Sequence, residues 1–288
     1  MSNPSLPAHI EESVNALVVP ALLPTVESLP QRSPIERLLS PLDQLAENSE
    51  RLFSKSLGEF QSAGQTYRVP RYVFLGPDGG GNTIRIGVFA AIHGDEPEGT
   101  FALTRFASLL EANPQLAQGY ALFLYPVCNP TGFEDLTRHS RSGKDLNREF
   151  WSESQEPEVR MLQSEICLQA FDGIVTLHGD DTSDGLYGFV GGSVLSESLL
   201  EPALAAAEKV LPRNRNHVID GFDARRGIIN DGYRGMLKHV PNLPRPPFEI
   251  TFETPQKAPV HLQVEAFVAA LKTILVEYRH LISIAQNM

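Results

Sequence analysis

Apolar residues along the chain follow two spacings, one typical of buried strands and one typical of helices. Short apolar runs predict strands at 66–76, 83–92, 120–127, 171–178 and 248–254. Helical spacing of apolar residues predicts helices at 97–112, 155–170, 194–210 and 261–284. Strands that alternate with helices of this length predict an α/β domain whose mostly parallel or mixed central sheet is covered on both faces.

The N-terminal part of the chain has a different pattern. Residues 1–33 are rich in Pro and Ser and predict an irregular arm, whereas 34–58 has helical spacing that Pro41 interrupts, so one helix or two are expected. PDGGGN at 77–82 predicts the turn of a hairpin. We therefore expect residues 1–65 to form an N-terminal extension packed on the body, and residues 66–288 to form a single domain.

Composition narrows the range of partners. The 288 residues include 24 Lys and Arg against 35 Asp and Glu, a formal net charge of −11, whereas nucleic acids and anionic membranes require a basic surface. No apolar run approaches the roughly 18–20 residues that span a bilayer. Cys128 and Cys167 lie in apolar segments typical of buried free thiols, and no secretory signal is visible. We expect a cytoplasmic protein without nucleic-acid or membrane partners.

Ionisable residues follow three of the predicted strands directly. His93 and Glu96 follow the strand at 83–92, while His178 and Glu253 end later strands. Because ligands bind at the carboxyl ends of strands in open α/β sheets, these side chains are expected to meet at one edge. Two histidines, one carboxylate and a water form a known catalytic zinc set, and the remaining glutamate can act on that water. The other histidines are expected to be surface or packing residues: His9, His139, His217, His239, His261 and His280.

The segment 128–150 holds three arginines after a buried strand at the same edge. A guanidinium beside an amide binds a carboxylate in a fixed plane, which makes Asn147 and Arg148 candidates for a substrate carboxylate. A second arginine near a metal stabilises the oxyanion of a tetrahedral intermediate, a role open to Arg138 or Arg141. Ordinary surface charge is the alternative for these two arginines.

Five motifs occur in a fixed order between about residues 84 and 254: AAIHGDEPEGT, NPTGF, KDLNREF, TLHGD and FEITFET. Together they resemble the carboxypeptidase A-type zinc metallopeptidase superfamily, and the HGDE form most resembles its succinylglutamate desuccinylase/aspartoacylase branch. The resemblance implies an α/β/α sandwich around a mixed, mostly parallel central sheet of about eight strands.

The resemblance also implies roles for individual residues. One Zn²⁺ per chain would be bound by His93, Glu96 and His178. Asn147 and Arg148 would bind the terminal carboxylate of the substrate, and Arg141, or less likely Arg138, would contact the scissile carbonyl. Glu253 would act as general base and acid. Tyr233 would be the mobile tyrosine that family carboxypeptidases place upstream of the base. A packing role in a glycine-rich loop is the alternative for Tyr233.

One departure from the family bears on the substrate. Aspartoacylase-like enzymes carry a separate C-terminal β domain that narrows access to the site, whereas here 35 residues follow Glu253 and most of them predict one helix. We therefore expect a catalytic domain alone, with a cleft open enough to admit a peptide. The acidic segment 179–185 is expected to be a solvated turn, with a cation or second-metal site as the alternative.

The sequence thus predicts a zinc-dependent metallocarboxypeptidase that hydrolyses an amide bond next to a free carboxylate. Its substrate is expected to be a peptide or an N-acyl amino acid. The alternative enzyme is an N-acyl-amino-acid deacylase of the succinylglutamate desuccinylase/aspartoacylase type. The alternative from another class is a non-catalytic zinc- or peptide-binding protein.

Overall fold

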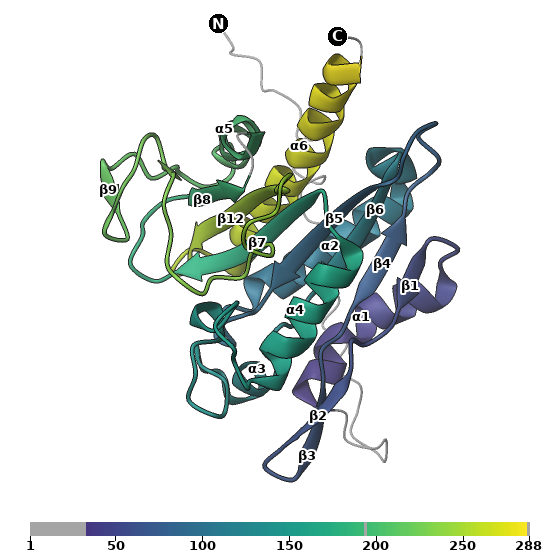
Figure 1. Ribbon diagram of the computed structural model, residues 1–288, viewed down its shortest axis with the longest axis vertical. Coiled ribbons are helices and arrows are strands. Elements are labelled where there is room, and N and C mark those ends of the chain that lie inside the picture. Colours follow the sequence, from purple (N-terminus) through teal and green to yellow (C-terminus); the bar gives the residue numbers. More distant parts are fainter. Residues whose placement is uncertain (1–32, 193–194, 287–288) are drawn as a thin grey trace, which may run out of the picture. The chain divides into compact units, whose positions relative to one another are not determined.

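The computed structural model describes residues 33–192 and 195–286, so the arm predicted for residues 1–33 lies almost wholly outside the described residues. An eight-stranded sheet forms the centre of the body (Figure 1). Its strands, in spatial order, are β1 (Leu52–Ser54), β4 (Tyr72–Leu75), β6 (Tyr120–Tyr125), β5 (Ile84–Ala90), β7 (Gly173–Asp180), β12 (Phe248–Pro255), β8 (Tyr187–Gly192) and β11 (Ile228–Ile229). β6, β5, β7 and β12 are parallel, and β1, β4 and β8 pair antiparallel to their inner neighbours.

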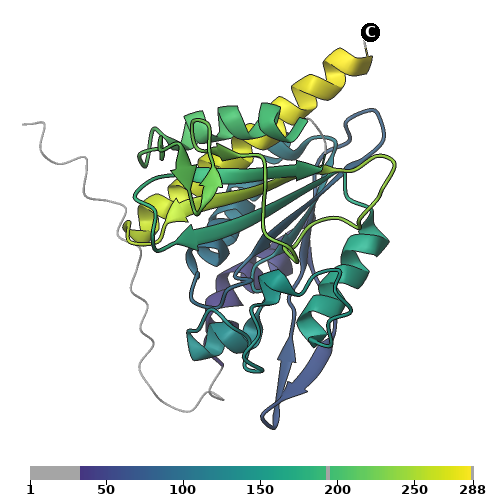
Figure 2. The same cartoon turned by 60° about the vertical axis from the view of Figure 1, so that its left-hand side comes forward.

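Helices cover both faces of this sheet, which confirms the predicted α/β/α sandwich (Figure 2). The α-helices are α1 (Pro34–Asn48), α2 (Glu98–Ala112), α3 (Pro130–Asp135), α4 (Pro157–Gln169), α5 (Leu195–Ala207) and α6 (Val260–Gln286). Short 3₁₀ turns lie at Pro114–Ala117 and Leu146–Arg148, and small hairpins pair β2 (Glu59–Ser62) with β3 (Gln65–Arg68) and β9 (Val218–Ile219) with β10 (Phe222–Asp223).

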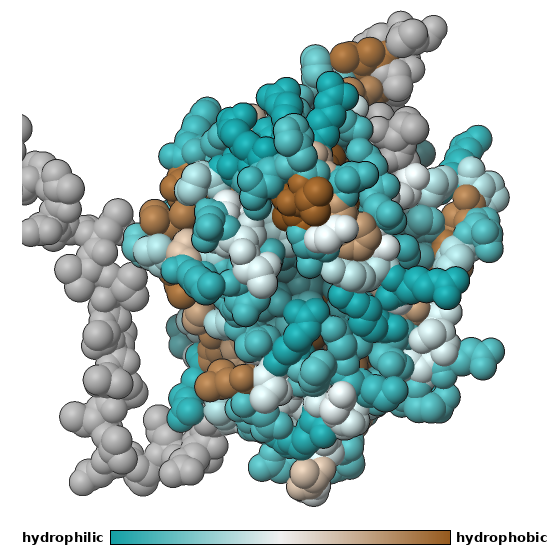
Figure 3. Space-filling model, turned by 90° about the vertical axis from the view of Figure 1, so that its left-hand side faces the viewer, coloured by the Kyte–Doolittle hydropathy of each residue, from teal (hydrophilic) through white to brown (hydrophobic). Residues whose placement is uncertain are grey.

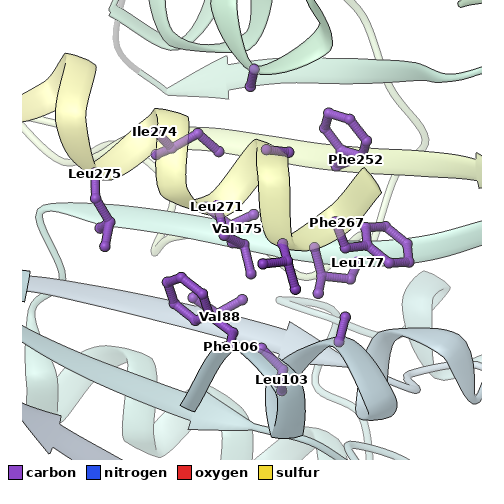
Figure 4. Packing of buried hydrophobic residues seen from close by; sticks show 14 of the residues in the cluster. Val88, Leu103, Phe106, Val175, Leu177, Phe252, Phe267, Leu271, Ile274 and Leu275 are labelled. Carbon is purple, nitrogen blue, oxygen red and sulfur yellow. The ribbon is translucent and has the colours of Figure 1, made fainter. Parts of the chain in front are cut away.

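The larger apolar core lies between the sheet and α2, α5 and α6. Val175 and Leu177 of β7 and Phe252 of β12 pack there against Phe267 and Leu271 of α6 (Figure 4). A second apolar cluster joins the opposite face of β5, β6 and β7 to α4. The strands are therefore buried on both faces over most of their length, as their continuous apolar runs predict.

The structure corrects three local predictions. The segment 34–58 forms α1 only as far as Asn48, with Pro41 inside the helix, and β1 follows as an edge strand. The predicted strand at 66–76 is divided around Pro70 into β3 and β4. Residues 77–82 do not close a hairpin, because β6 lies between β4 and β5 in the sheet.

The two cysteines differ in their surroundings. Cys128 is buried, and burial raises the pKa of its thiol, whereas Cys167 is exposed, so the prediction of two buried thiols is wrong for Cys167. Among the described residues, no helix is both long and apolar enough to cross a membrane.

Candidate active site

His93 and Glu96 lie in the turn that joins β5 to α2. Ala91, directly after the strand, adopts a left-handed backbone conformation with φ of 48°. Gly94 packs so closely on Gly132 that an added Cβ would lie 1.9 Å from the carbonyl carbon of Gly132. The turn therefore requires glycine at this position.

His178 and Glu253 lie at the same edge of the sheet, on neighbouring strands. They are directly opposite each other in the parallel register of β7 and β12. Their chain neighbours Leu177 and Phe252 point into the core beneath α6. Because successive residues of a strand face opposite sides, His178 and Glu253 point to the other face, as the pattern of the sequence predicts.

Three of the predicted residues form a group that can hold a metal ion. The Nδ1 atom of His93 lies 2.6 Å from Oε1 of Glu96, and Nδ1 of His178 lies 3.0 Å from Oε2 of the same carboxylate. One ligand atom from each residue falls within 4.8 Å of the others, and all three side chains are buried. This convergence indicates a metal site.

The donor set fits a transition-metal cation such as Zn²⁺. Two imidazole nitrogens and one carboxylate are a known catalytic zinc set, which leaves a coordination position for water. The Nε2 atom of His93 faces Oδ1 of Asp145 at 3.3 Å, and such a carboxylate fixes the ring and the tautomer of a metal-binding histidine. The Nε2 atom of His178 is buried without a hydrogen-bond partner among the described residues, so its Nδ1 is the nitrogen with a polar neighbour.

Asp145 is a site residue that the sequence analysis missed. Its carboxylate accepts hydrogen bonds from the Arg138 guanidinium, at 3.0 and 3.1 Å, in addition to facing His93. These contacts hold the pKa of Asp145 below its ordinary value although burial opposes the shift. The KDLNREF motif contains Asp145, but its acidic residue gives no sign in the sequence that it would face His93.

Arg138 and Arg141 occupy different environments. Nη1 of Arg138 lies 3.2 Å from Nδ1 of His93, so this guanidinium borders the metal group. The Arg141 guanidinium instead pairs with Asp135 at 2.6 Å and with Glu134 at 3.2 Å. Arg138 thus lies at the metal group, whereas acidic neighbours outside the site hold Arg141, the arginine that the sequence analysis preferred.

The candidate carboxylate clamp is present beside the metal group. Asn147 is buried and its Oδ1 accepts a hydrogen bond from the backbone N–H of Leu237 at 2.8 Å, whereas its amide Nδ2 has no hydrogen-bond partner among the described residues. The Arg148 guanidinium carbon lies 3.9 Å from the ring centroid of Tyr233, and the Tyr233 hydroxyl donates to the backbone oxygen of Asp220. Tyr233 therefore covers Arg148 at the pocket wall.

Glu253 lies in an acidic environment. Burial, and then the nearby carboxylates of Glu96, Asp180 and Asp220, raise the pKa of Glu253 well above its ordinary value, while Arg138 acts in the opposite direction. The segment 179–185, expected to be a solvated turn, contributes Asp180 to the wall of this pocket.

These side chains line one cavity of about 290 Å³. Its wall includes all the predicted site residues except Arg141: His93, Glu96, Arg138, Asn147, Arg148, His178, Tyr233 and Glu253. Figure 3 shows the face toward which β7 and β12 point, which is mainly hydrophilic and hollowed near its centre. The carboxyl edge of the sheet thus brings together in one pocket a group that can hold a metal ion, a guanidinium beside an amide, and a buried acid.

Comparison with known proteins finds a matching family model for the middle of the chain. Residues 82–214 match the model of the succinylglutamate desuccinylase/aspartoacylase catalytic domain. Comparison with curated proteins finds no matching relative.

Solved structures of similar fold come from several bacteria. A candidate metallopeptidase from Shewanella denitrificans OS217 is 21% identical, with a TM-score of 0.70 over 85% of this chain and 90% of that chain. A candidate metallopeptidase from Shewanella amazonensis SB2B is 25% identical, with a TM-score of 0.69 over 84% and 92%. A metallo-carboxypeptidase from Pseudomonas aeruginosa, in complex with (2-guanidinoethylmercapto)succinic acid, is 19% identical, with a TM-score of 0.63 over 84% and 68%.

The family match and the shared fold confirm the resemblance that the sequence motifs carry. Residues 82–214 are similar to the succinylglutamate desuccinylase/aspartoacylase catalytic domain, and the chain has the carboxypeptidase-like fold. Both similarities are consistent with an enzyme of the hydrolase class.

Proposed function

We propose that the protein is a zinc-dependent metallocarboxypeptidase, which hydrolyses the amide bond next to a free carboxylate. The observation that carries this proposal is the shared pocket, in which His93, Glu96 and His178 lie beside Arg148 and Glu253. A metal group alone would fit many hydrolases. The neighbouring guanidinium and amide supply the recognition of a carboxylate that a carboxypeptidase requires.

Each side chain then has a defined task. When bound by this set, Zn²⁺ would acidify a water molecule and polarise the scissile carbonyl. Asp145 holds the His93 ring in place, and Asn147 and Arg148 bind the terminal carboxylate. The Arg138 guanidinium borders the metal group and donates hydrogen bonds to the oxygen that becomes negative during the reaction.

Glu253 is the proton carrier in this proposal. Its carboxylate lies in the same pocket and is not part of the metal group, so it is free to take a proton from the attacking water. Its buried, acidic surroundings raise its pKa and favour its protonated form, which then delivers the proton to the leaving amine.

A second candidate is an N-acyl-amino-acid deacylase, which the family match specifically favours. Both activities cleave an amide beside a carboxylate and use the same clamp. The succinic acid derivative bound by the Pseudomonas aeruginosa enzyme is consistent with a carboxylate-bearing, amino-acid-like substrate in either case.

The proposal is tested by comparing peptides with free and amidated C-termini. The zinc-loaded protein should cleave the free peptide and lose activity on chelation. Arg148→Ala should lower kcat/KM for the free peptide about tenfold to a hundredfold, because a charge-assisted hydrogen bond is lost, and should have little effect on the amidated peptide. Arg105→Ala removes an exposed arginine in α2 and serves as the control.

Two outcomes would contradict the peptidase assignment. If amidation of the peptide lowered kcat/KM equally in wild type and Arg148→Ala, Arg148 would not bind the terminal carboxylate. Hydrolysis of an N-acylated single amino acid, with no hydrolysis of any peptide, would replace the peptidase by the deacylase. Metal analysis of the purified protein, compared with His93→Ala, tests the ligand set independently of activity.

A further inference from the structure

Glu98 is a buried carboxylate that the proposed mechanism does not use. It lies in the first turn of α2, two residues after Glu96, and is only 2% exposed. Its Oε1 atom is buried without a hydrogen-bond partner among the described residues. Glu158 also follows a proline in the first turn of a helix, but it accepts a hydrogen bond from the Thr131 hydroxyl. Because an unpaired buried oxygen lowers stability, the placement of Glu98 calls for an explanation.

The Oε1 atom of Glu98 faces the backbone of Gly179. A Cβ added at Gly179 would overlap this oxygen, so the glycine and the carboxyl group are in direct contact, with a Cα–H of Gly179 directed at Oε1. Gly179 follows His178 in β7 and pairs with Thr254 of β12 in the central sheet. Glu98 therefore contacts β7 directly beside a histidine of the metal group.

The same glycine contacts the metal group through its backbone. Its N–H donates a hydrogen bond to Oε2 of Glu96 at 3.1 Å, and this oxygen also lies 3.0 Å from Nδ1 of His178. A shift of Gly179 would change this hydrogen bond and move the His178 ring, because both are attached to the same stretch of backbone. The position of Gly179 thus sets how the Glu96 carboxylate and the His178 ring face each other.

The start of α2 is packed closely on this end of β7. A Cβ added at Gly99 would lie 3.2 Å from Cβ of Leu177, closer than an ordinary van der Waals contact, so the glycine allows the helix to approach the strand. Gln256 links the two segments as well. Its side-chain amide donates to the Asp95 carbonyl at 3.0 Å, and its backbone N–H donates to the Asp180 carbonyl at 2.9 Å. The turn before α2 and the end of β7 are therefore fixed together beside the buried carboxyl group.

We propose that Glu98 is a positioning residue for the metal group, and that it acts through Gly179. Its oxygen supports the backbone of Gly179, so that the N–H of this residue and the His178 ring face the Glu96 carboxylate before a metal ion binds. Such support reduces the rearrangement on binding and so raises metal affinity. The inference rests on the metal group of the proposed function. Glu98 does not line the catalytic pocket, so its role is separate from that of Glu253.

The test measures the zinc dissociation constant of the full-length protein by competition with a coloured chelator. Glu98→Ala should raise this constant about 10- to 100-fold, the usual effect of losing support behind a metal ligand. Glu98→Gln keeps an oxygen that can rest on Gly179 and should stay within about threefold of wild type. Leu110→Ala weakens the buried packing at the other end of α2, and should leave the constant within about twofold of wild type.

Gly179→Ala tests the contact itself. In the wild-type background its methyl group would collide with Glu98, so the zinc dissociation constant should rise at least about tenfold. In the Glu98→Ala background the space is open, so the same substitution should raise the constant less than about threefold further. Equal effects of Gly179→Ala in the two backgrounds would show that the two residues act independently and would overturn the proposal.

Three further outcomes would also overturn it. The first is unchanged zinc affinity in Glu98→Ala, and the second is an equal loss in Glu98→Gln, which would assign the effect to charge. The third is a comparable loss in Leu110→Ala, which would reduce the effect to a general loosening of α2. Any of these, in a protein that cleaves the free peptide with zinc, would leave the proposed function intact. The expected pattern of zinc affinities in a protein that cleaves no peptide would uphold the positioning role and contradict the proposed function.

Discussion

The two faces of β7 and β12 have opposite chemistry, although the same eight-residue strands form both. On the face beneath α6, Val175, Leu177 and Phe252 pack into a continuous apolar core. On the other face, at alternate positions, His178 and Glu253 reach the catalytic pocket. The polar face is nonetheless almost as buried as the apolar face, since His178 and Glu253 are only 3% and 8% exposed.

This difference shows how the fold positions the site. Extended strands fix alternate side chains on a rigid frame, and the apolar face anchors that frame through α6. The ionisable side chains are thereby held buried at a cost in stability, which the contact with Glu96 offsets for His178 and which the acidic neighbours of Glu253 increase. Substitutions on the two faces should therefore separate catalysis from stability.

The largest effect is expected on the polar face. Glu253→Gln keeps the shape of the side chain but removes its basicity, so kcat should fall at least 10²–10⁴-fold, the typical contribution of a positioned general base. Metal content and melting temperature should stay close to those of wild type. If turnover per folded molecule persisted while the melting temperature fell, Glu253 would be a structural residue and the comparison between the faces would fail.

The neighbouring position should behave in the opposite way. Phe252 is fully buried, and Phe252→Ala should lower the free energy of unfolding by about 3–5 kcal/mol through lost burial and a residual cavity. Turnover per folded molecule, measured at low temperature with correction for the folded fraction, should remain within a few fold of wild type. A loss of kcat comparable to that of Glu253→Gln would mean that the core face controls the site geometry directly.

The strand framework of the site was predictable because each strand carries its own signal. The apolar runs of β5, β7 and β12 locate their carboxyl ends, and His93, His178 and Glu253 follow from these ends. β8 was missed because YGFVGG is rich in glycine and too weak in β-branched residues to predict a strand.

The loop residues were less predictable because their positions depend on distant contacts. Arg141 and Arg138 are three residues apart in similar sequence, and only the acidic residues at 134 and 135, together with Tyr67 from β3, hold Arg141 away from the site. Glu98 lies in a helix that was predicted, but its contact with Gly179 depends on β7, which is distant in the sequence.

The smallest of the three effects concerns Glu158, a buried acid in α4, the helix that packs on the same face of the sheet as the pocket. Glu158 lies in the first turn of α4, is 1% exposed, and accepts a hydrogen bond from the Thr131 hydroxyl of α3. Burial, with a contribution from the Glu156 charge, raises the pKa of Glu158 to about 7. The folded protein therefore holds a proton on Glu158 at pH values where the unfolded chain, with an ordinary glutamate pKa, has released it.

The sign of the effect on stability follows from this difference. Below the pKa of about 4.3 of a glutamate in the unfolded chain, Glu158 is protonated in both states and does not change the free energy of unfolding. As the pH rises toward 7, only the unfolded chain releases the proton, so Glu158 lowers the free energy of unfolding increasingly. Above pH 7 this loss is constant. Glu158→Gln should thus match wild type at pH 4 and exceed its free energy of unfolding by about 1–3 kcal/mol at pH 8. Urea unfolding of both proteins from pH 4 to pH 8 measures this difference, with the exposed Glu265→Gln as a control that should show none. A pH-independent difference would mean that Glu158 ionises normally, and that this side of the sheet tolerates buried charge outside the catalytic pocket as well.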